Sequence, residues 1–160
     1  MVEPSPGGTA NYGFDPFGRL TSVTDAGNAV TTWTYNLNGA LTALSHPDRG
    51  NWSYTPNSLG EVLSQTDAKP QTTTMTYDLL GRILTRLEPE GSTTYWTWGT
   101  SAAAHEMGQL NRLDGPSYLE VYAFDANGRP SQTTITADTT YAINYDYNTT
   151  TGLPESMTYP

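Results

Sequence analysis

Glycine recurs in this chain at a fixed interval of 21 residues, and that spacing limits the folds the chain can adopt. Gly18, Gly39, Gly60 and Gly81 follow one another at this distance, and an apolar residue stands two positions after each. Internal repeats of this length build folds in which each copy packs against the next. The structure of one copy therefore predicts the structure of the others.

The fourth copy has the pattern of a β-hairpin. Residues 72–77 form a strand by propensity and alternation, and residues 82–87 form the return strand. Residues 78–81 form the turn, because Asp accepts hydrogen bonds from nearby backbone N–H groups and Gly supplies the positive φ. The period leaves no room for a crossover helix, so neighbouring strands are antiparallel. The sequence predicts an all-β fold of antiparallel hairpin repeats, arranged as a curved sheet or solenoid.

The other copies are more degenerate. Residues 122–130 form another clear copy, and the copy that opens at Trp98 has an enlarged turn near residues 99–108. In the third copy Tyr54 lies two residues further upstream than expected, which predicts a longer turn. About seven copies occupy residues 11–160. Residues 1–10 have the composition of a linker or a truncated end, and they do not resemble a signal peptide.

The composition favours strands and excludes several classes of partner. The chain contains 27 Thr, 11 Tyr and 4 Trp, residue types that favour strands. The net charge of −9 disfavours nucleic acid and anionic membrane surfaces, which require a cationic face. No apolar run is long enough to span a bilayer. Cysteine is absent, so packing and ladder hydrogen bonds must supply the stability.

The turn motifs resemble the YD repeat of RHS (rearrangement hotspot) proteins. The resemblance rests on a Tyr-Asp or Phe-Asp pair followed by Gly-Arg and an apolar residue, as in residues 77–83, 14–20 and 124–129. Similar repeats occur in toxin-complex B and C components and in teneurins. The residues that define the repeat are Phe14, Asp15, Gly18, Arg19, Tyr35, Gly39, Tyr54, Gly60, Tyr77, Asp78, Gly81, Arg82, Phe124, Asp125, Gly128 and Arg129.

The resemblance implies a structural function. In that family the repeats build a hollow shell, which in bacterial members encloses a toxic C-terminal domain. The implied partners are other RHS repeats of the parent chain, an encapsulated toxin domain, or further copies that associate through strand edges. The implied location is a secreted or cell-surface bacterial protein, with neither nucleic acid nor membrane insertion. The segment lacks the self-cleavage region and the variable toxin tail.

The residue pattern indicates no catalytic, cofactor or metal site. The Asp residues fall at turn positions that the repeat fixes, where turn capping explains them. His46 and His105 have no Cys or second His at metal-ligand spacing. The Arg that follows the turn glycine is expected to pair with a nearby Asp or to cover an aromatic ring. The chain is therefore predicted not to be an enzyme.

The aromatic residues leave an alternative function open. Alternation within the strands places Trp33 with Tyr35, and Trp96 with Trp98, on one face of the sheet. Packed against a neighbouring layer these rows are core, but exposed rows can stack on sugars. The alternative is a carbohydrate-binding or cell-surface interaction module, with Trp33, Trp52, Trp96 and Trp98 as candidates for sugar stacking.

Overall fold

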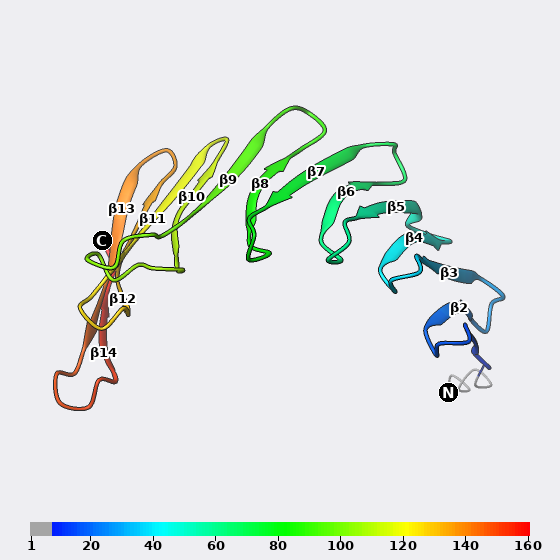
Figure 1. Ribbon diagram of the computed structural model, residues 1–160, viewed down its shortest axis with the longest axis horizontal. Helices are drawn as coiled ribbons and strands as arrows, with labels where there is room; N and C mark the ends of the chain where they lie inside the picture. Colours follow the sequence, from blue (N-terminus) through cyan, green and yellow to red (C-terminus); the bar gives the residue numbers. More distant parts are fainter. Residues whose placement is uncertain (1–7) are drawn as a thin grey trace, which may run out of the picture. The chain divides into compact units, whose positions relative to one another are not determined.

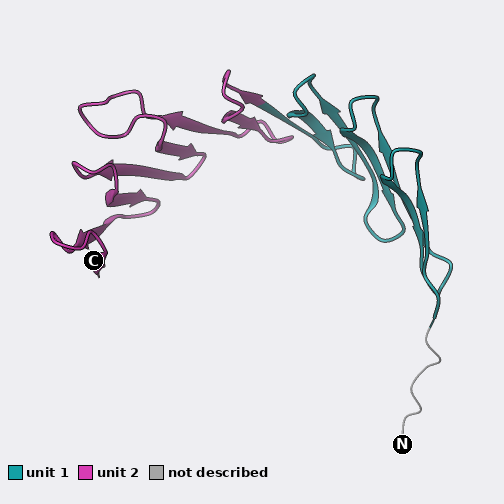
Figure 2. Cartoon of the chain, turned by 60° about the horizontal axis from the view of Figure 1, so that its bottom comes forward, with its two compact units in different colours: residues 1–75 teal, residues 76–160 magenta. Residues whose placement is uncertain are grey.

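The computed structural model describes residues 8–160. The predicted linker or truncated end thus lies mostly outside the described residues. The chain divides into two compact units, residues 1–75 and 76–160, coloured teal and magenta in Figure 2. Each unit is a run of antiparallel hairpins.

The described residues contain fourteen β-strands and no helix (Figure 1). In unit 1 these are β1 (Asn11–Phe14), β2 (Leu20–Thr24), β3 (Val30–Tyr35), β4 (Leu41–His46), β5 (Gly50–Pro56) and β6 (Val62–Thr66). The boundary between the units falls inside β7 (Thr72–Tyr77). In unit 2 they are β8 (Ile83–Leu87), β9 (Thr93–Trp98), β10 (Leu110–Gly115), β11 (Tyr118–Phe124), β12 (Pro130–Thr136), β13 (Thr140–Tyr147) and β14 (Pro154–Thr158).

Strands that are consecutive in the chain are neighbours in the sheet, in the order β1 to β14. The pairing is antiparallel along the row, for example Trp33 opposite Leu44 between β3 and β4. Sequential pairing follows from the short connections, which cannot carry a strand across a sheet. The all-β prediction of antiparallel hairpin repeats is confirmed.

Each regular turn has the same backbone geometry. In the first hairpin the Asp15 N–H donates to the Arg19 carbonyl, and the Gly18 N–H donates back to the Asp15 carbonyl. The ladder shifts by one residue beside the turn, between Gly13 and Phe14, and Gly18 has a φ of 80°. This is the short hairpin loop in which a left-handed residue closes a bulge, so glycine is required at that position.

The predicted longer turn in the third copy is wrong. The Asn57 N–H donates to the Glu61 carbonyl and the Gly60 N–H to the Asn57 carbonyl, which is the pattern of the first hairpin. Pro56 pairs with Val62 and occupies the position that an aromatic residue fills in other copies. Tyr54 lies two pairs upstream, because it belongs to the alternating row of β5 and not to the turn.

The fifth hairpin has a long, hydrogen-bonded loop, residues 99–109. The Gly99 N–H donates to the Gln109 carbonyl, and the Gly108 N–H donates to the Gly99 carbonyl, so the loop closes at its base. Between these bonds the chain forms turns, and the Ala-rich stretch forms no helix. The Gln109 side chain also donates to the His105 carbonyl, which holds the loop against the turn.

The two faces of each unit differ in composition. Trp33, Tyr35, Trp52 and Tyr54 are half-buried, whereas their neighbours Thr32, Thr34, Ser53 and Thr55 point to the other side and are exposed. We call the first side the aromatic face; in unit 2 it carries Trp96, Trp98, Glu120, Tyr122, Tyr145 and Tyr147. We call the other side of unit 1 the hydroxyl face. Its longest rows of cross-strand partners are Gly13, Ser22, Thr32, Ser45 and Asn51, and Thr34, Ala43, Ser53, Thr66 and Thr72.

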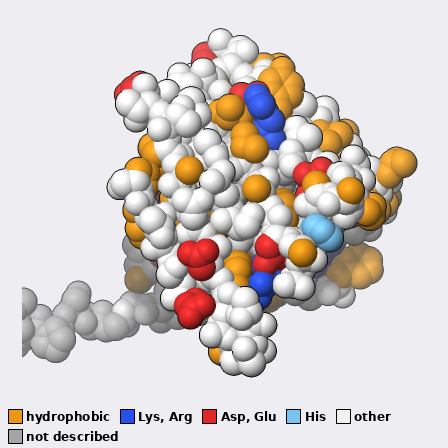
Figure 3. All heavy atoms as spheres, turned by 90° about the vertical axis from the view of Figure 1, so that its left-hand side faces the viewer, with side chains coloured by type: hydrophobic (Ala, Val, Ile, Leu, Met, Phe, Trp, Pro, Cys, Tyr) orange, Lys and Arg blue, Asp and Glu red, His pale blue; other side chains and the backbone are white. Residues whose placement is uncertain are grey.

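Neither unit has a conventional hydrophobic core. Among residues 8–160 no hydrophobic side chain is fully buried, and the buried polar side chains are those of Thr73 and Thr133. The space-filling view in Figure 3 shows uncharged polar and backbone atoms over most of one face, with acidic and basic side chains scattered. Each unit is therefore a single layer, and stability must come from the ladders and from contacts between hairpins.

Candidate functional site

The turn Asp and the turn Arg form an ion pair within one hairpin. Asp15 Oδ1 accepts the backbone N–H groups of Phe17 (2.9 Å) and Arg19 (3.0 Å), which fixes the turn. Its other oxygen, Oδ2, accepts Nε of Arg19 at 2.6 Å. The same arrangement joins Asp78 to Arg82 and Asp125 to Arg129. The ion pair leaves the flat guanidinium in a fixed orientation beside the turn.

The guanidinium then reaches the next hairpin. Arg19 Nη1 donates to the Asn36 carbonyl at 3.2 Å, and its guanidinium carbon lies 4.9 Å from the centre of the Tyr35 ring. This combines a charge-assisted hydrogen bond with a cation–π contact. The same two contacts join Arg82 to Gly108 (3.3 Å) and Trp98 (4.8 Å), and Arg129 to Gly152 (2.8 Å) and Tyr147 (4.0 Å).

The aromatic residue returns a hydrogen bond to the preceding hairpin. The Tyr35 hydroxyl donates to the Leu20 carbonyl at 2.9 Å, so this bond joins the same two hairpins as the Arg19 contacts. The indole N–H of Trp98 donates to the Ile83 carbonyl (2.8 Å), and the Tyr147 hydroxyl donates to the Pro130 carbonyl (2.9 Å). We call the Asp, the Arg and the next hairpin's ring and turn carbonyl an arginine clamp. Each clamp fixes one hairpin to the next by bonds in both directions.

Some copies lack the arginine. In the fifth hairpin Gln109 stands there, and its amide donates to the Gly128 carbonyl at 2.8 Å, so it replaces the forward hydrogen bond without the charge. In the second hairpin Ala40 stands there, and its methyl side chain has no donor to offer. In the third, Glu61 accepts from the Asn57 amide inside its own turn. Gln109 was not singled out from the sequence, although it follows the turn glycine Gly108.

The clamps lower the pKa of the turn carboxyl groups. Partial burial alone raises the pKa of Asp15, but hydrogen bonds from Arg19 and the Phe17 amide outweigh it, so the pKa lies below its ordinary 3.8. The pKa of Asp78 is lowered against the same opposing effect, mainly by Arg82. For Asp125 the side-chain hydrogen bond from Arg129 is the largest cause of the lowered pKa.

Acid is therefore expected to weaken the clamps. A carboxyl with a depressed folded-state pKa contributes stability that is complete above the unfolded value of 3.8 and disappears as the pH falls through the folded value. The triple variant Asp15→Asn, Asp78→Asn, Asp125→Asn should lose most of this acid dependence, because the Asn side chain does not titrate. Asn still caps the turn, as Asn36 does. Urea denaturation between about pH 5 and pH 2 measures it. Asp138→Asn, outside the clamps, should leave the profile unchanged; an unchanged profile in the triple variant contradicts the assignment.

A second titratable cluster lies on the aromatic face of unit 2. The Glu120 carboxylate accepts hydrogen bonds from the hydroxyls of Tyr118 and Tyr122. The hydrogen bond to Glu120 is the main cause that raises the pKa of Tyr118 to about 12. Burial is the largest cause of the raised pKa of Tyr122, followed by its bond to Glu120. Both phenols are thus held in the neutral, donating form.

This cluster predicts a loss of stability in alkali. Because its folded-state pKa is raised, Tyr118 contributes stability that is complete below the ordinary value of 10.0 and is lost as the pH rises through about 12. The raised pKa of Tyr122 acts in the same direction. Glu120→Gln should let the two tyrosines ionise earlier and reduce the alkaline loss. Tyrosinate absorbance during a pH titration, combined with urea denaturation, measures both effects. Identical titration curves for the variant and the parent chain would contradict this arrangement.

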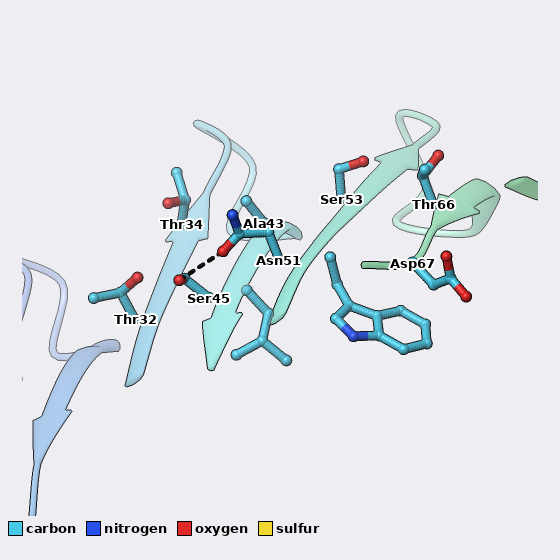
Figure 4. A pocket seen from close by; sticks show the side chains of 10 residues that line it. Thr32, Thr34, Ala43, Ser45, Asn51, Ser53, Thr66 and Asp67 are labelled. Atoms are coloured by element: carbon cyan, nitrogen blue, oxygen red, sulfur yellow. Dashed lines mark hydrogen bonds between the residues drawn. The ribbon is translucent and has the colours of Figure 1, made fainter. Parts of the chain in front are cut away.

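The hydroxyl face of unit 1 contains a shallow cavity of about 350 Å³. Thr32, Thr34, Ala43, Ser45, Asn51, Ser53, Thr66 and Asp67 line it (Figure 4). Ser45 Oγ donates to the side-chain oxygen of Asn51 at 2.7 Å, the dashed line in Figure 4, so no base activates this hydroxyl. Trp52 and Leu44 also border the cavity, but they pair with each other on the aromatic face. The lining offers neutral polar contacts and lacks the arrangement of a hydrolytic site.

The four tryptophans proposed for sugar stacking are all half-buried on the aromatic face. Trp33 and Trp52 flank Leu44 in one row, and Trp96 lies opposite Leu113. Aliphatic side chains on the return strands thus separate the aromatic residues of neighbouring copies. Trp98 has the Arg82 guanidinium over its ring, so that ring face is occupied.

The histidines take part in local backbone contacts. His46 Nδ1 accepts the N–H groups of Asp48 (3.0 Å) and Arg49 (3.3 Å), the role that Asp25 has in the equivalent turn of the first copy. His105 lies in the long loop with a φ of 57°. Within residues 8–160 no three His, Cys, Asp or Glu side chains gather to hold a metal ion. The same residues include no helix long and apolar enough to cross a membrane.

A solved structure from a toxin complex has this fold. The TcdB2-TccC3 complex without its hypervariable C-terminal region matches with a TM-score of 0.76 and 17% identity, over 94% of this chain and 9% of that chain. A Photorhabdus luminescens Tc holotoxin pore aligns over 96% of this chain and 11% of that chain, with 16% identity and a TM-score of only 0.35. The chain therefore spans a small fraction of the similar TcdB2-TccC3 chain. A comparison with curated protein sequences gave no match.

The fold and the clamps define a class of protein: a single-layer sheet of YD-type hairpins, several of which are joined to the next hairpin through their turns. Residues 14–50 and 57–93 match the family described as RHS Repeat. The chain carries RHS repeats, and the resemblance inferred from its turn motifs is confirmed.

Proposed function

We propose that this chain forms part of the wall of an RHS-type shell that encloses a toxic C-terminal domain. The observation that carries the proposal is the arginine clamp, which fixes one hairpin to the next at three places in a sheet only one layer thick. A wall needs strong contacts along its length and no catalytic groups on its faces. The parent protein is then a bacterial protein that is secreted or presented at the cell surface.

The assignment of the polar residues supports a structural function. Asp15, Asp78 and Asp125 cap turns and hold arginines, while Asn36 and Asn57 cap turns in the copies that lack an arginine. These side chains are therefore occupied by structural roles in the turns. RHS repeats are structural in the family, and this chain follows that role.

The proposed partners are further RHS repeats on either side. A sheet with consecutive pairing has one edge at β1 and one at β14, and β14 is exposed along its whole length. Unpaired strand edges accept another strand through backbone hydrogen bonds. Other repeats of the parent chain fit these edges, and the enclosed domain would meet one of the two faces.

Protease protection in the full-length parent protein tests the proposal. A C-terminal domain enclosed by the shell should resist a protease that cleaves it when it is free. Arg82→Ala combined with Trp98→Ala should expose it, because both partners of one clamp are removed. Leu79→Ala is the matched control, since this side chain is 102% exposed and makes no clamp. A C-terminal domain that is cleaved equally fast in the unaltered parent would overturn the enclosure.

A further inference from the structure

The surroundings of each turn glycine show whether a side chain of the preceding hairpin contacts that turn. A Cβ added at Gly39 would lie 3.4 Å from Arg19 Nη1, and one at Gly152 would lie 3.5 Å from Arg129 Nη1. At Gly108 the nearest atom is Arg82 Nη1 (3.9 Å), and Gly128 has the Gln109 amide nitrogen at 3.5 Å. The receiving side of each of these turns is occupied by a donor from the hairpin before it.

The first hairpin has the same receiving side, and within the described residues nothing occupies it. No atom lies within 4 Å of a Cβ placed on Gly18. Phe14 stands where Tyr35 and Trp98 stand in their hairpins, directly before the turn, and is 60% exposed. Tyr12, next along the same side of β1, is 62% exposed. The ring and the side of the turn glycine that face a guanidinium elsewhere in the chain are open here.

We propose that the outer edge of the first hairpin, formed by Phe14, Asp15 and Gly18 with the unpaired side of β1, binds an arginine-bearing hairpin of the YD type. The incoming Arg places its guanidinium over the Phe14 ring and donates to a carbonyl of the turn. The chain already contains three copies of this contact, so the partner is expected to use the same chemistry as Arg19, Arg82 and Arg129. The proposal rests on the clamp geometry and holds whether or not the shell encloses a toxin.

A second copy of this chain does not supply that partner. Its last hairpin carries Leu153 at the position of the clamp arginine, directly after the turn glycine Gly152. The end of the sheet that would meet Phe14 in a head-to-tail assembly therefore offers an aliphatic side chain instead of a guanidinium. The surface fits a repeat with Gly-Arg after its turn, upstream in the same parent chain or in another chain.

Glutamine is the competing donor. Phe124, the other phenylalanine at this position, lies in the hairpin that receives Gln109, and a Phe ring returns no hydrogen bond. A charged donor is favoured for Phe14 because the chain carries a net charge of −9, and because cation–π contact adds to the hydrogen bond only for arginine. The experiment below separates the two donors.

An extended chain tests the proposal directly. Residues 72–92, a complete copy with Asp78 and Arg82, are inserted between Gly8 and Thr9, so that the inserted arginine precedes Phe14 as Arg82 precedes Trp98. The register is kept because Trp98 and Phe14 are 84 residues apart (98 − 14), four periods of 21. Replacing the inserted arginine by Ala should lower the folding equilibrium constant about 2- to 30-fold, the range for a cation–π contact. In a Phe14→Ala background the same replacement should have a clearly smaller effect.

Controls separate the clamp from a general effect of the insert. Ala at the inserted copy of Arg86, which in the chain itself pairs with Glu88, should change the folding equilibrium constant by the same factor with and without the Phe14 ring. Gln at the inserted clamp position should give a lower folding equilibrium constant than Arg if the positive charge contributes to the contact. If replacing the inserted arginine by Ala costs the same whether Phe14 is intact or truncated to alanine, the proposal is overturned. Gln matching Arg would overturn it as well.

Sedimentation of the unmodified chain tests the choice of partner. Strand edges are expected to give some concentration-dependent association, but Phe14→Ala should not change it, because Leu153 cannot take the place of arginine. Leu37→Ala, at a turn side chain that is 103% exposed, serves as the matched control. A loss of association specific to Phe14→Ala would show that a second copy occupies this surface and would overturn the partner assigned here.

Discussion

Trp98→Ala is expected to lower the free energy of unfolding by about 2 to 3 kcal/mol, somewhat less than a fully buried Trp loses on truncation. The substitution removes the ring under Arg82, the indole hydrogen bond to the Ile83 carbonyl, and the half-buried aromatic surface. Urea denaturation followed by circular dichroism measures the loss. Unit 2 has no fully buried hydrophobic side chain, so contacts of this kind must supply much of its stability.

Two variants show which part of Trp98 matters. Trp98→Phe keeps a ring for the guanidinium and loses the indole donor, so its free energy of unfolding should lie between those of the parent chain and Trp98→Ala. Leu79→Ala, at a fully exposed turn position, should change the unfolding free energy by less than about 0.5 kcal/mol. A Trp98→Ala variant no less stable than Leu79→Ala would contradict the clamp.

Rebuilding a clamp where it is missing should stabilise unit 1 by about 2 to 4 kcal/mol, the sum of a cation–π contact and a charge-assisted hydrogen bond. The second hairpin has Asn36 and Ala40 where a clamp has Asp and Arg, and the third has Pro56 where a clamp has a ring. The variant Asn36→Asp, Ala40→Arg, Pro56→Tyr supplies all three. Its new tyrosine hydroxyl would donate to the Leu41 carbonyl, as Tyr35 does to Leu20.

The matched control is Ala40→Arg alone. Without a ring to cover or a carboxylate to hold it, this arginine should change the unfolding free energy by less than about 0.5 kcal/mol. Urea denaturation of the single and triple variants gives the comparison. A triple variant no more stable than the single one would show that the three side chains do not act together.

The glycine period was sufficient to predict the hairpin, its antiparallel pairing and the all-β class. Those features depend on local chemistry: Asp78 caps a turn and Gly81 takes a positive φ wherever the copy lies. The longer turn predicted for the third copy was wrong, because that prediction followed the position of an aromatic residue and not the turn residues. Asn57 and Gly60 make the standard turn bonds whether Tyr or Pro precedes them.

The reach of the arginine across hairpins was not predictable in detail. An Arg beside an Asp suggests a local ion pair, and that pair exists for Arg19 and Asp15 at 2.6 Å. The contact with Asn36, 17 residues further on, depends on the distance between adjacent turns, which no local pattern contains. The hydrogen bond that Gln109 makes in place of an arginine was not predictable for the same reason, since its acceptor, the Gly128 carbonyl, lies in the next hairpin.

A double-mutant cycle between Arg82 and Trp98 tests the central claim most directly. The parent chain, Arg82→Ala, Trp98→Leu and the double variant are compared by urea denaturation, with the Arg86 and Trp98 pair as a control cycle. If the clamp joins the two hairpins, the coupling free energy should be about 0.5 to 2 kcal/mol. Losses that add to within about 0.3 kcal/mol would mean that the arginine and the ring stabilise their own hairpins separately.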